Sequence, residues 1–95
     1  MSTSQQTLQE TMTSLDAAEV LVRARAFFAS RPSIYATFLD KEGPGFCSFR
    51  GQGGEELIIA ASPNADGGTR VTGSTYLFDM QVSRFFSTLP PVSQS

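Results

Sequence analysis

Residues 34–78 read IYATFLDKEGPGFCSFRGQGGEELIIAASPNADGGTRVTGSTYLF, and this stretch decides the fold. Its segments rich in strand-forming residues are 34–39, 46–50, 57–61 and 69–78. Turns rich in Gly and Pro separate these segments, at 42–45, 51–54 and 63–68. Because the connections are short, we expect the four strands to form an antiparallel meander.

A helix is expected on each side of the four strands. Residues 15–30 contain no Gly or Pro and follow Ser14, which we expect to be the N-cap. Residues 79–89 begin with Asp79 as a second cap and end before a Pro-Pro pair. The sequence therefore predicts a two-layer α+β fold of the order α-β-β-β-β-α, with an N-terminal helix, a four-stranded antiparallel sheet and a short C-terminal helix.

The length of 95 residues predicts a single small domain, which we place at residues 14–89. Residues 1–13 are rich in Ser, Thr and Gln, and we expect them to be a disordered tail, like residues 90–95. No stretch resembles a signal peptide or a membrane span, and the lone Cys47 cannot form an intramolecular disulfide. We therefore expect a cytoplasmic protein without membrane insertion.

The charge and residue composition argue against several function classes. A net charge of −2 and a pI of about 4.9 provide no basic surface, so nucleic acid is not an expected partner. The chain has no histidine, which is the commonest general base and metal ligand, and its nine acidic residues lack a metal-binding spacing. Cys47 has no histidine to activate it and is expected to be a core residue. We therefore predict no catalytic residue, no metal and no cofactor.

The predicted sheet is apolar on both faces, and this property suggests the function. Residues 57–61 form the unbroken apolar run LIIAA, typical of a central strand buried on both sides, whereas Gly73 suggests a bulge or bend in the last strand. One helical layer covers only one face. We therefore predict a non-catalytic module that forms a homodimer or higher oligomer through its sheet and acts as a small apolar-ligand binder or an accessory subunit of a larger complex. The candidate ligand or interface residues are Tyr35, Phe38, Phe49, Arg50, Glu56, Ile58, Arg70 and Tyr76.

Two other functions stay open at this point. The first is a small cofactor-free enzyme of cyclase, isomerase or hydrolase type, with Tyr35 or Tyr76 acting beside Glu55, Glu56 or Arg50 in an apolar pocket. The second is an adaptor whose sheet edge or Phe-rich helix docks on a larger protein.

Residues 67–88 also carry a resemblance to a known family. The stretch GGTRVTGSTYLF, followed by a helix with Arg-Phe-Phe, resembles the closing strand and C-terminal helix of the START/Bet v 1-like helix-grip superfamily. The resemblance implies a curved antiparallel sheet around a helix, with apolar ligands held between them. Because this chain is too short for the six or seven strands of that superfamily, it implies a reduced or half-sized relative, of which two copies would close a comparable cavity.

Overall fold

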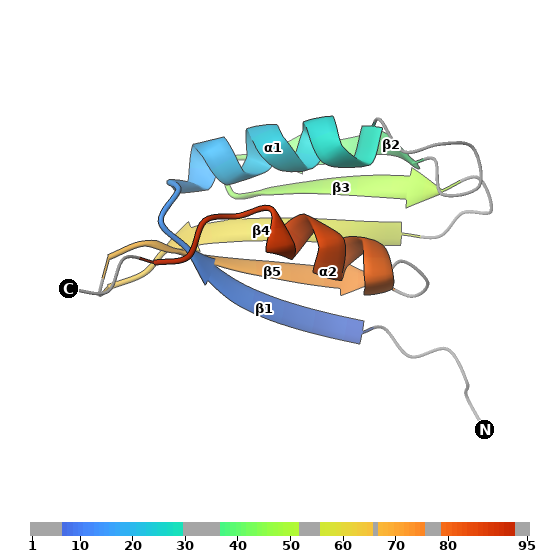
Figure 1. Cartoon of the computed structure of the whole chain (residues 1–95). Helices are drawn as coiled ribbons and strands as arrows, with labels where there is room; N and C mark the ends of the chain where they lie inside the picture. The colour runs from blue at the N-terminus through green and yellow to red at the C-terminus, as the bar shows by residue number, and fades with distance from the viewer. Residues whose placement is uncertain (1–6, 30–36, 52–55, 66, 76–78, 93–95) are drawn as a thin grey trace, which may run out of the picture.

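The protein folds as one antiparallel sheet with two helices on the same face (Figure 1). The computed structural model describes residues 7–29, 37–51, 56–65, 67–75 and 79–92. Its elements are β1 (Thr7–Thr13), α1 (Ala17–Ala29), β2 (Thr37–Gly43), β3 (Phe46–Gly51), β4 (Glu56–Pro63), β5 (Thr69–Thr75) and α2 (Asp79–Ser87). The strand order is β1-β5-β4-β3-β2. The α+β class and the antiparallel meander from β2 to β5 are therefore confirmed.

The sheet has a fifth strand that the sequence analysis missed. Residues 7–13, assigned above to a disordered tail, form β1 and pair with β5 from Thr7 opposite Thr75 to Thr13 opposite Thr69. The reason is an alternation in which Gln9, Thr11 and Thr13 point to one face while Leu8, Glu10 and Met12 point to the other. Few of these side chains are strongly apolar, so pairing with β5 provides the stability that burial of apolar side chains does not.

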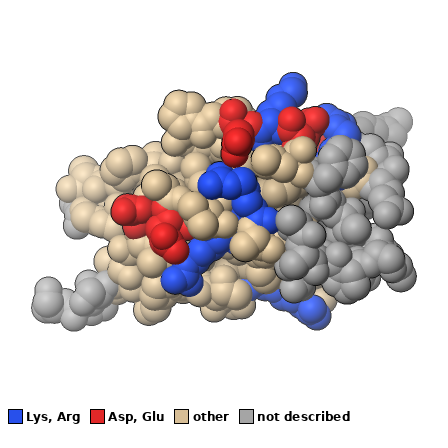
Figure 2. Space-filling view, turned by 90° about the horizontal axis from the view of Figure 1, so that it is seen from above, with Lys and Arg blue, Asp and Glu red and all other residues tan. Residues whose placement is uncertain are grey.

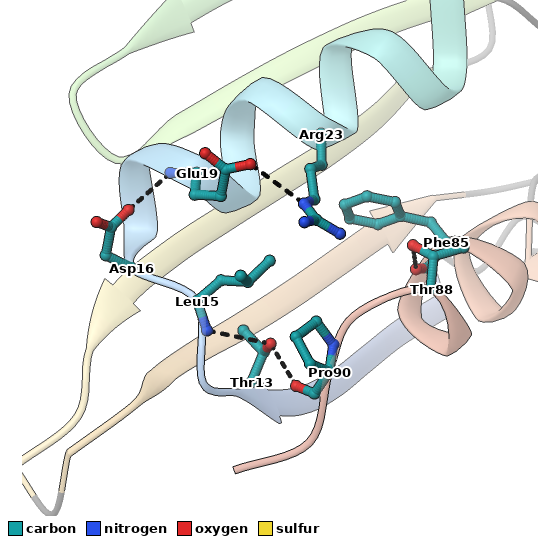
Figure 3. Close-up of polar contacts among 8 residues, drawn as sticks. All are labelled: Thr13, Leu15, Asp16, Glu19, Arg23, Phe85, Thr88 and Pro90. Atoms are coloured by element: carbon teal, nitrogen blue, oxygen red, sulfur yellow. Dashed lines mark hydrogen bonds and ion pairs between the residues drawn. The ribbon is translucent and has the colours of Figure 1, made fainter. Parts of the chain in front are cut away.

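Helix α1 begins later than expected, and its cap is Asp16 instead of Ser14. The Asp16 Oδ1 atom accepts a hydrogen bond of 2.8 Å from the backbone N–H of Glu19, which is the geometry of an N-cap (Figure 3). One turn later, the Arg23 Nε atom donates to Glu19 Oε2 at 3.2 Å and forms an i, i+4 ion pair. These contacts fix the start of the helix at Ala17.

Strand β2 extends further along the chain than the sequence indicated. The turn expected at 42–45 is limited to Pro44 and Gly45, and Glu42 and Gly43 still pair with β3. The register shifts between Leu39 and Lys41, so the bulge of this sheet lies in β2. Of the bulge or bend predicted at Gly73, the bulge is wrong, because Gly73 pairs regularly with both Gln9 and Ile59.

The hydrophobic core lies between the helices and the sheet, and phenylalanines form its centre. The rings of Phe28, Phe49 and Phe85 are fully buried, with centroids 5.3 Å apart for Phe28 and Phe49 and 5.5 Å apart for Phe28 and Phe85. Phe27 adds an edge contact to Phe28 at 5.0 Å. The other buried hydrophobic residues are Val20, Leu21, Ala24, Cys47, Leu57, Ile59, Ala61, Val71, Val82 and Leu89. The core therefore joins α1 and α2 to each other as well as to the sheet.

Gly73 allows α2 to approach the sheet closely. A Cβ atom at this position would lie 2.6 Å from Val82 Cγ1 and 3.4 Å from the end of the Ile59 side chain. Carbon atoms normally pack at about 3.5–4.0 Å, so any side chain here would push α2 away. This close approach shows that the face of β5 bearing Gly73 is the face that the helices cover.

The chain after α2 is held at the end of the sheet. The Pro90 carbonyl oxygen accepts a hydrogen bond of 2.6 Å from Thr13 Oγ1 (Figure 3). It also accepts one of 3.3 Å from the Ser14 backbone N–H. Val92 lies close to Gly68, where a Cβ atom would be 3.1 Å from Val92 Cγ2. Residues 90–92, which the sequence assigned to a second tail, therefore pack against the end of β1 and the turn before β5, while residues 93–95 lie outside the described residues.

Candidate interaction surface on the open face of the sheet

The face of the sheet opposite the helices has no covering layer within the described residues (Figure 1). Side chains alternate along a strand, and directly paired residues point to the same face. Because Phe49, Ile59 and Gly73 lie under the helices, the residues between them point away. The open face defined in this way contains Leu8, Glu10, Met12, Lys41, Phe46, Ser48, Arg50, Glu56, Ile58, Ala60, Ser62, Arg70, Thr72 and Ser74.

Apolar side chains on the open face are only partly shielded. Leu8 is 69% exposed and Phe46 37% exposed, and Met12, Ile58 and Ala60 are partly exposed. Strand β4 is central, as predicted, but burial on both sides is wrong for the single chain: Leu57, Ile59 and Ala61 are buried, while Ile58 and Ala60 are not. The outer face of the central strand therefore still has apolar area to bury.

Ion pairs occupy two opposite corners of the open face. The Arg50 Nη2 atom on β3 lies 3.2 Å from Asp40 Oδ2 and 3.8 Å from Glu56 Oε2. Arg70 Nε on β5 lies 3.3 Å from Glu10 Oε2 on β1. The side chains are partly exposed, so each pair contributes about 0–1 kcal/mol to stability.

Charges elsewhere on the molecule are also mixed in sign. Arg25 on α1 pairs with Glu42 on β2 at 3.3 Å. Acidic and basic side chains lie next to one another in the view from above, and neither sign forms a patch of its own there (Figure 2). This view gives no support to recognition of a strongly charged partner.

The structure separates the residues that the sequence grouped as one candidate site. Arg50, Glu56, Ile58 and Arg70 lie on the open face, and Arg50 and Glu56 are direct cross-strand neighbours. Phe49 is fully buried beneath the helices, so it belongs to the core and is not accessible to a partner. Tyr35, Tyr76 and Glu55 lie outside the described residues. The backbone of Phe38 is opposite Arg50 in β2.

The described residues do not form a reactive centre around Cys47. Its thiol is buried on the helix side, and this burial raises the pKa of the thiol to about 11. The positive charge of Arg25 lowers the pKa in part, and the negative charge of Glu42 raises it further. A thiol with this pKa stays protonated at neutral pH and is a poor nucleophile. No group of three or more Cys, Asp or Glu side chains among the described residues is arranged to hold a metal ion.

Leu8, Glu10 and Met12 belong to the open face but were missed by the sequence analysis. Their strand was assigned to a tail because its composition is polar. The signal that could have identified them is the alternation of Leu8, Glu10 and Met12 with β-branched threonines, which is typical of a half-buried edge strand.

Comparison with protein-family models, with curated proteins and with solved structures finds no match for this chain. The resemblance of residues 67–88 to the helix-grip superfamily therefore stays a prediction. Among the described residues, neither helix has the length and apolar character needed to cross a membrane.

Proposed function

We propose that this protein is a non-catalytic, self-associating module in which two copies pack together through their open sheet faces. The observation that carries the proposal is the one-sided placement of the helices, which leaves the apolar side chains of Leu8, Phe46 and Ile58 without a covering layer among the described residues. A second copy provides an identical apolar sheet, and two such faces pack as in a β-sandwich, about 10 Å apart.

The size of the open face is close to what a specific dimer requires. Five strands about 4.8 Å apart, each with about seven residues rising 3.3 Å, cover roughly 24 by 23 Å, or ~550 Å² per copy before surface roughness is counted. Specific interfaces begin at roughly 600 Å² of accessible surface per partner. Most of the open face must therefore be used, which favours a sheet-to-sheet dimer over contact through one corner.

The charges on the open face also fit a second copy. The positive side chains Lys41, Arg50 and Arg70 are balanced by Glu10, Asp40 and Glu56, which either lie on this face or pair with its residues. A surface of zero net charge does not repel its own copy. The face is not suited to attract a partner of high charge.

An apolar ligand, on this proposal, lies at the joint between the copies. The helix-grip resemblance implies a ligand between sheet and helix, but Phe28, Phe49 and Phe85 pack against one another there. The open face offers the small side chains of Ala60, Thr72 and Ser74 beside the larger Ile58, Phe46 and Leu8, while Ser48 is buried between its neighbours. If the dimer holds no ligand, we propose instead that it acts as an accessory subunit of a larger complex.

Native mass spectrometry and sedimentation at micromolar concentration test the proposal. The wild-type protein is expected to be a dimer, and Ile58→Asp, which places a charge at the centre of the open face, a folded monomer. The matched control is Val22→Asp, because Val22 is 49% exposed on α1 and lies away from the open face. It should remain a dimer. A wild-type protein that stays a compact monomer and binds no hydrophobic dye would refute self-association.

A further inference from the structure

Three cross-strand pairs on the open face straddle the line between β3 and β4. Arg50 is opposite Glu56, Ser48 is opposite Ile58, and Phe46 is opposite Ala60. Each pair joins unlike partners: a positive with a negative side chain, or a large with a small apolar or hydroxyl side chain. The two strands therefore present complementary rows along their shared line.

The row of side chains on β3 also complements the row on β4 of a second copy if the two-fold axis of the dimer runs along the line between β3 and β4. A two-fold axis that runs along the strands places each β3 against the β4 of the second copy. Arg50 then faces Glu56 of the second copy, and the reciprocal contact forms as well. Phe46 faces the small Ala60, and Ile58 faces the small Ser48. Large side chains thus meet small ones, as close packing of two sheets requires.

An axis placed over a single strand is less favourable. Over β4 it would set Glu56 against Glu56, and over β3 it would set Arg50 against Arg50. Over β5, Arg70 would meet Arg70. Juxtaposed like charges at an interface cost several kcal/mol, so the charges themselves select among these arrangements.

From this complementarity we infer that the sheet-to-sheet dimer has its two-fold axis between β3 and β4 and forms Arg50–Glu56 ion pairs between the two copies. The inference rests on the proposed function and adds the arrangement of the copies. Four strands of each copy, β5 to β2, overlap in this dimer, and β1 lies at its margin. Glu10 on β1 is consequently outside the overlap, and its ion-pair partner Arg70 lies near the N-terminal end of β5, away from the line between β3 and β4.

Charge-exchange variants test the axis directly. Arg50→Glu alone and Glu56→Arg alone each place like charges across the interface in both reciprocal contacts, and each is expected to weaken its own homodimer by roughly tenfold or more. An equimolar mixture restores both contacts, because the glutamate introduced at position 50 of one variant then faces the arginine introduced at position 56 of the other. With one variant mass-labelled, native mass spectrometry should show the heterodimer well above the statistical half.

Three further variants complete the experiment. Arg50→Glu and Glu56→Arg combined in one chain restore opposite charges between positions 50 and 56, within and between copies, although the ion pair of Arg50 with Asp40 is lost. This chain should still form a dimer and reports on folding. The matched control is Arg70→Glu mixed with Glu10→Arg, a similar exposed pair at 3.3 Å outside the central contact. This mixture should show no preference for the heterodimer.

The outcomes separate the two proposals. A wild-type dimer whose Arg50→Glu and Glu56→Arg variants show no preference for one another would overturn the axis and leave the open-face dimer standing. A wild-type monomer would overturn both. Preference in the Arg70→Glu and Glu10→Arg mixture alone would also contradict the inference.

Discussion

Replacement of Gly73 by alanine tests whether α2 is held at the closest distance that the sheet allows. The added Cβ atom would lie 2.6 Å from Val82 Cγ1, about 1 Å inside the normal carbon–carbon contact distance. Val82 is fully buried and, as a β-branched residue in a helix, has one strongly preferred rotamer, so it cannot rotate away. Helix α2 must therefore move, or the sheet must bend.

The expected cost follows from two opposing effects. Overpacking costs about 1–3 kcal/mol, whereas loss of glycine flexibility in the unfolded chain returns about 0.4–1 kcal/mol. We therefore expect Gly73→Ala to lower the free energy of unfolding by about 1–2 kcal/mol. Val82→Ala removes two buried methyl groups and should cost about 2 kcal/mol by itself.

The double variant distinguishes steric conflict from other causes. The new methyl group at position 73 fits the space that Val82→Ala leaves, so the combined loss should be at least 1 kcal/mol smaller than the two single losses added together. Urea denaturation at one fixed protein concentration measures all four proteins, since dimerisation makes stability depend on concentration. Additivity within about 0.5 kcal/mol, or a Gly73→Ala protein more stable than the wild type, would refute the close contact.

Two further predictions concern the turn before β5 and the buried thiol. Gly67 and Gly68 both have positive φ, at 93° and 79°, but only a Cβ at position 68 would meet neighbours, 3.0 Å from the Thr13 carbonyl oxygen. Gly67→Ala should therefore lower the free energy of unfolding by about 1 kcal/mol, and Gly68→Ala should lower it clearly more, as measured by thermal or urea unfolding. Equal losses would contradict the packing of Gly68 against Thr13. Because the pKa of Cys47 is about 11 in the folded protein against 9.0 for an unperturbed thiol, the unfolded chain ionises first and the free energy of unfolding should fall between pH 9 and 11. The fall should be smaller in Cys47→Ala, and parallel pH profiles would contradict the assignment.

The sequence was informative where its pattern is strong and local. The alternation and turns of residues 34–78 predicted the meander from β2 to β5, and the position of LIIAA in the central strand is confirmed. β1 could not be recognised in the same way, because its polar composition resembles a tail and its strand conformation depends on β5, far along the chain. The alternation of residues 7–13 is therefore a weak local signal, and only the long-range pairing with β5 shows that it forms a strand.

The candidate residues show the same limit. Alternation alone does not say which face of a strand the helices cover, so Phe49 and Arg50 were grouped together although they point to opposite faces. The sequence predicts a bulge or bend at Gly73, but glycine in a strand has several uses. Only the position of Val82 in three dimensions shows that here it allows the close approach of α2.

The pairing of β1 with β5 has a consequence for the order in which the chain folds. Thr13 finds its partner at Thr69 and Thr7 at Thr75, so β1 leaves the ribosome well before the strand that completes it. At roughly 5–20 residues per second of synthesis, this delay lasts several seconds, whereas a hairpin forms in about 1–10 μs. Neighbouring strands of the meander can pair as they are synthesised, whereas β1 can pair only after β5 has been synthesised. Contacts between such distant segments raise the contact order, so docking of β1 is expected to be the slow, late step of folding.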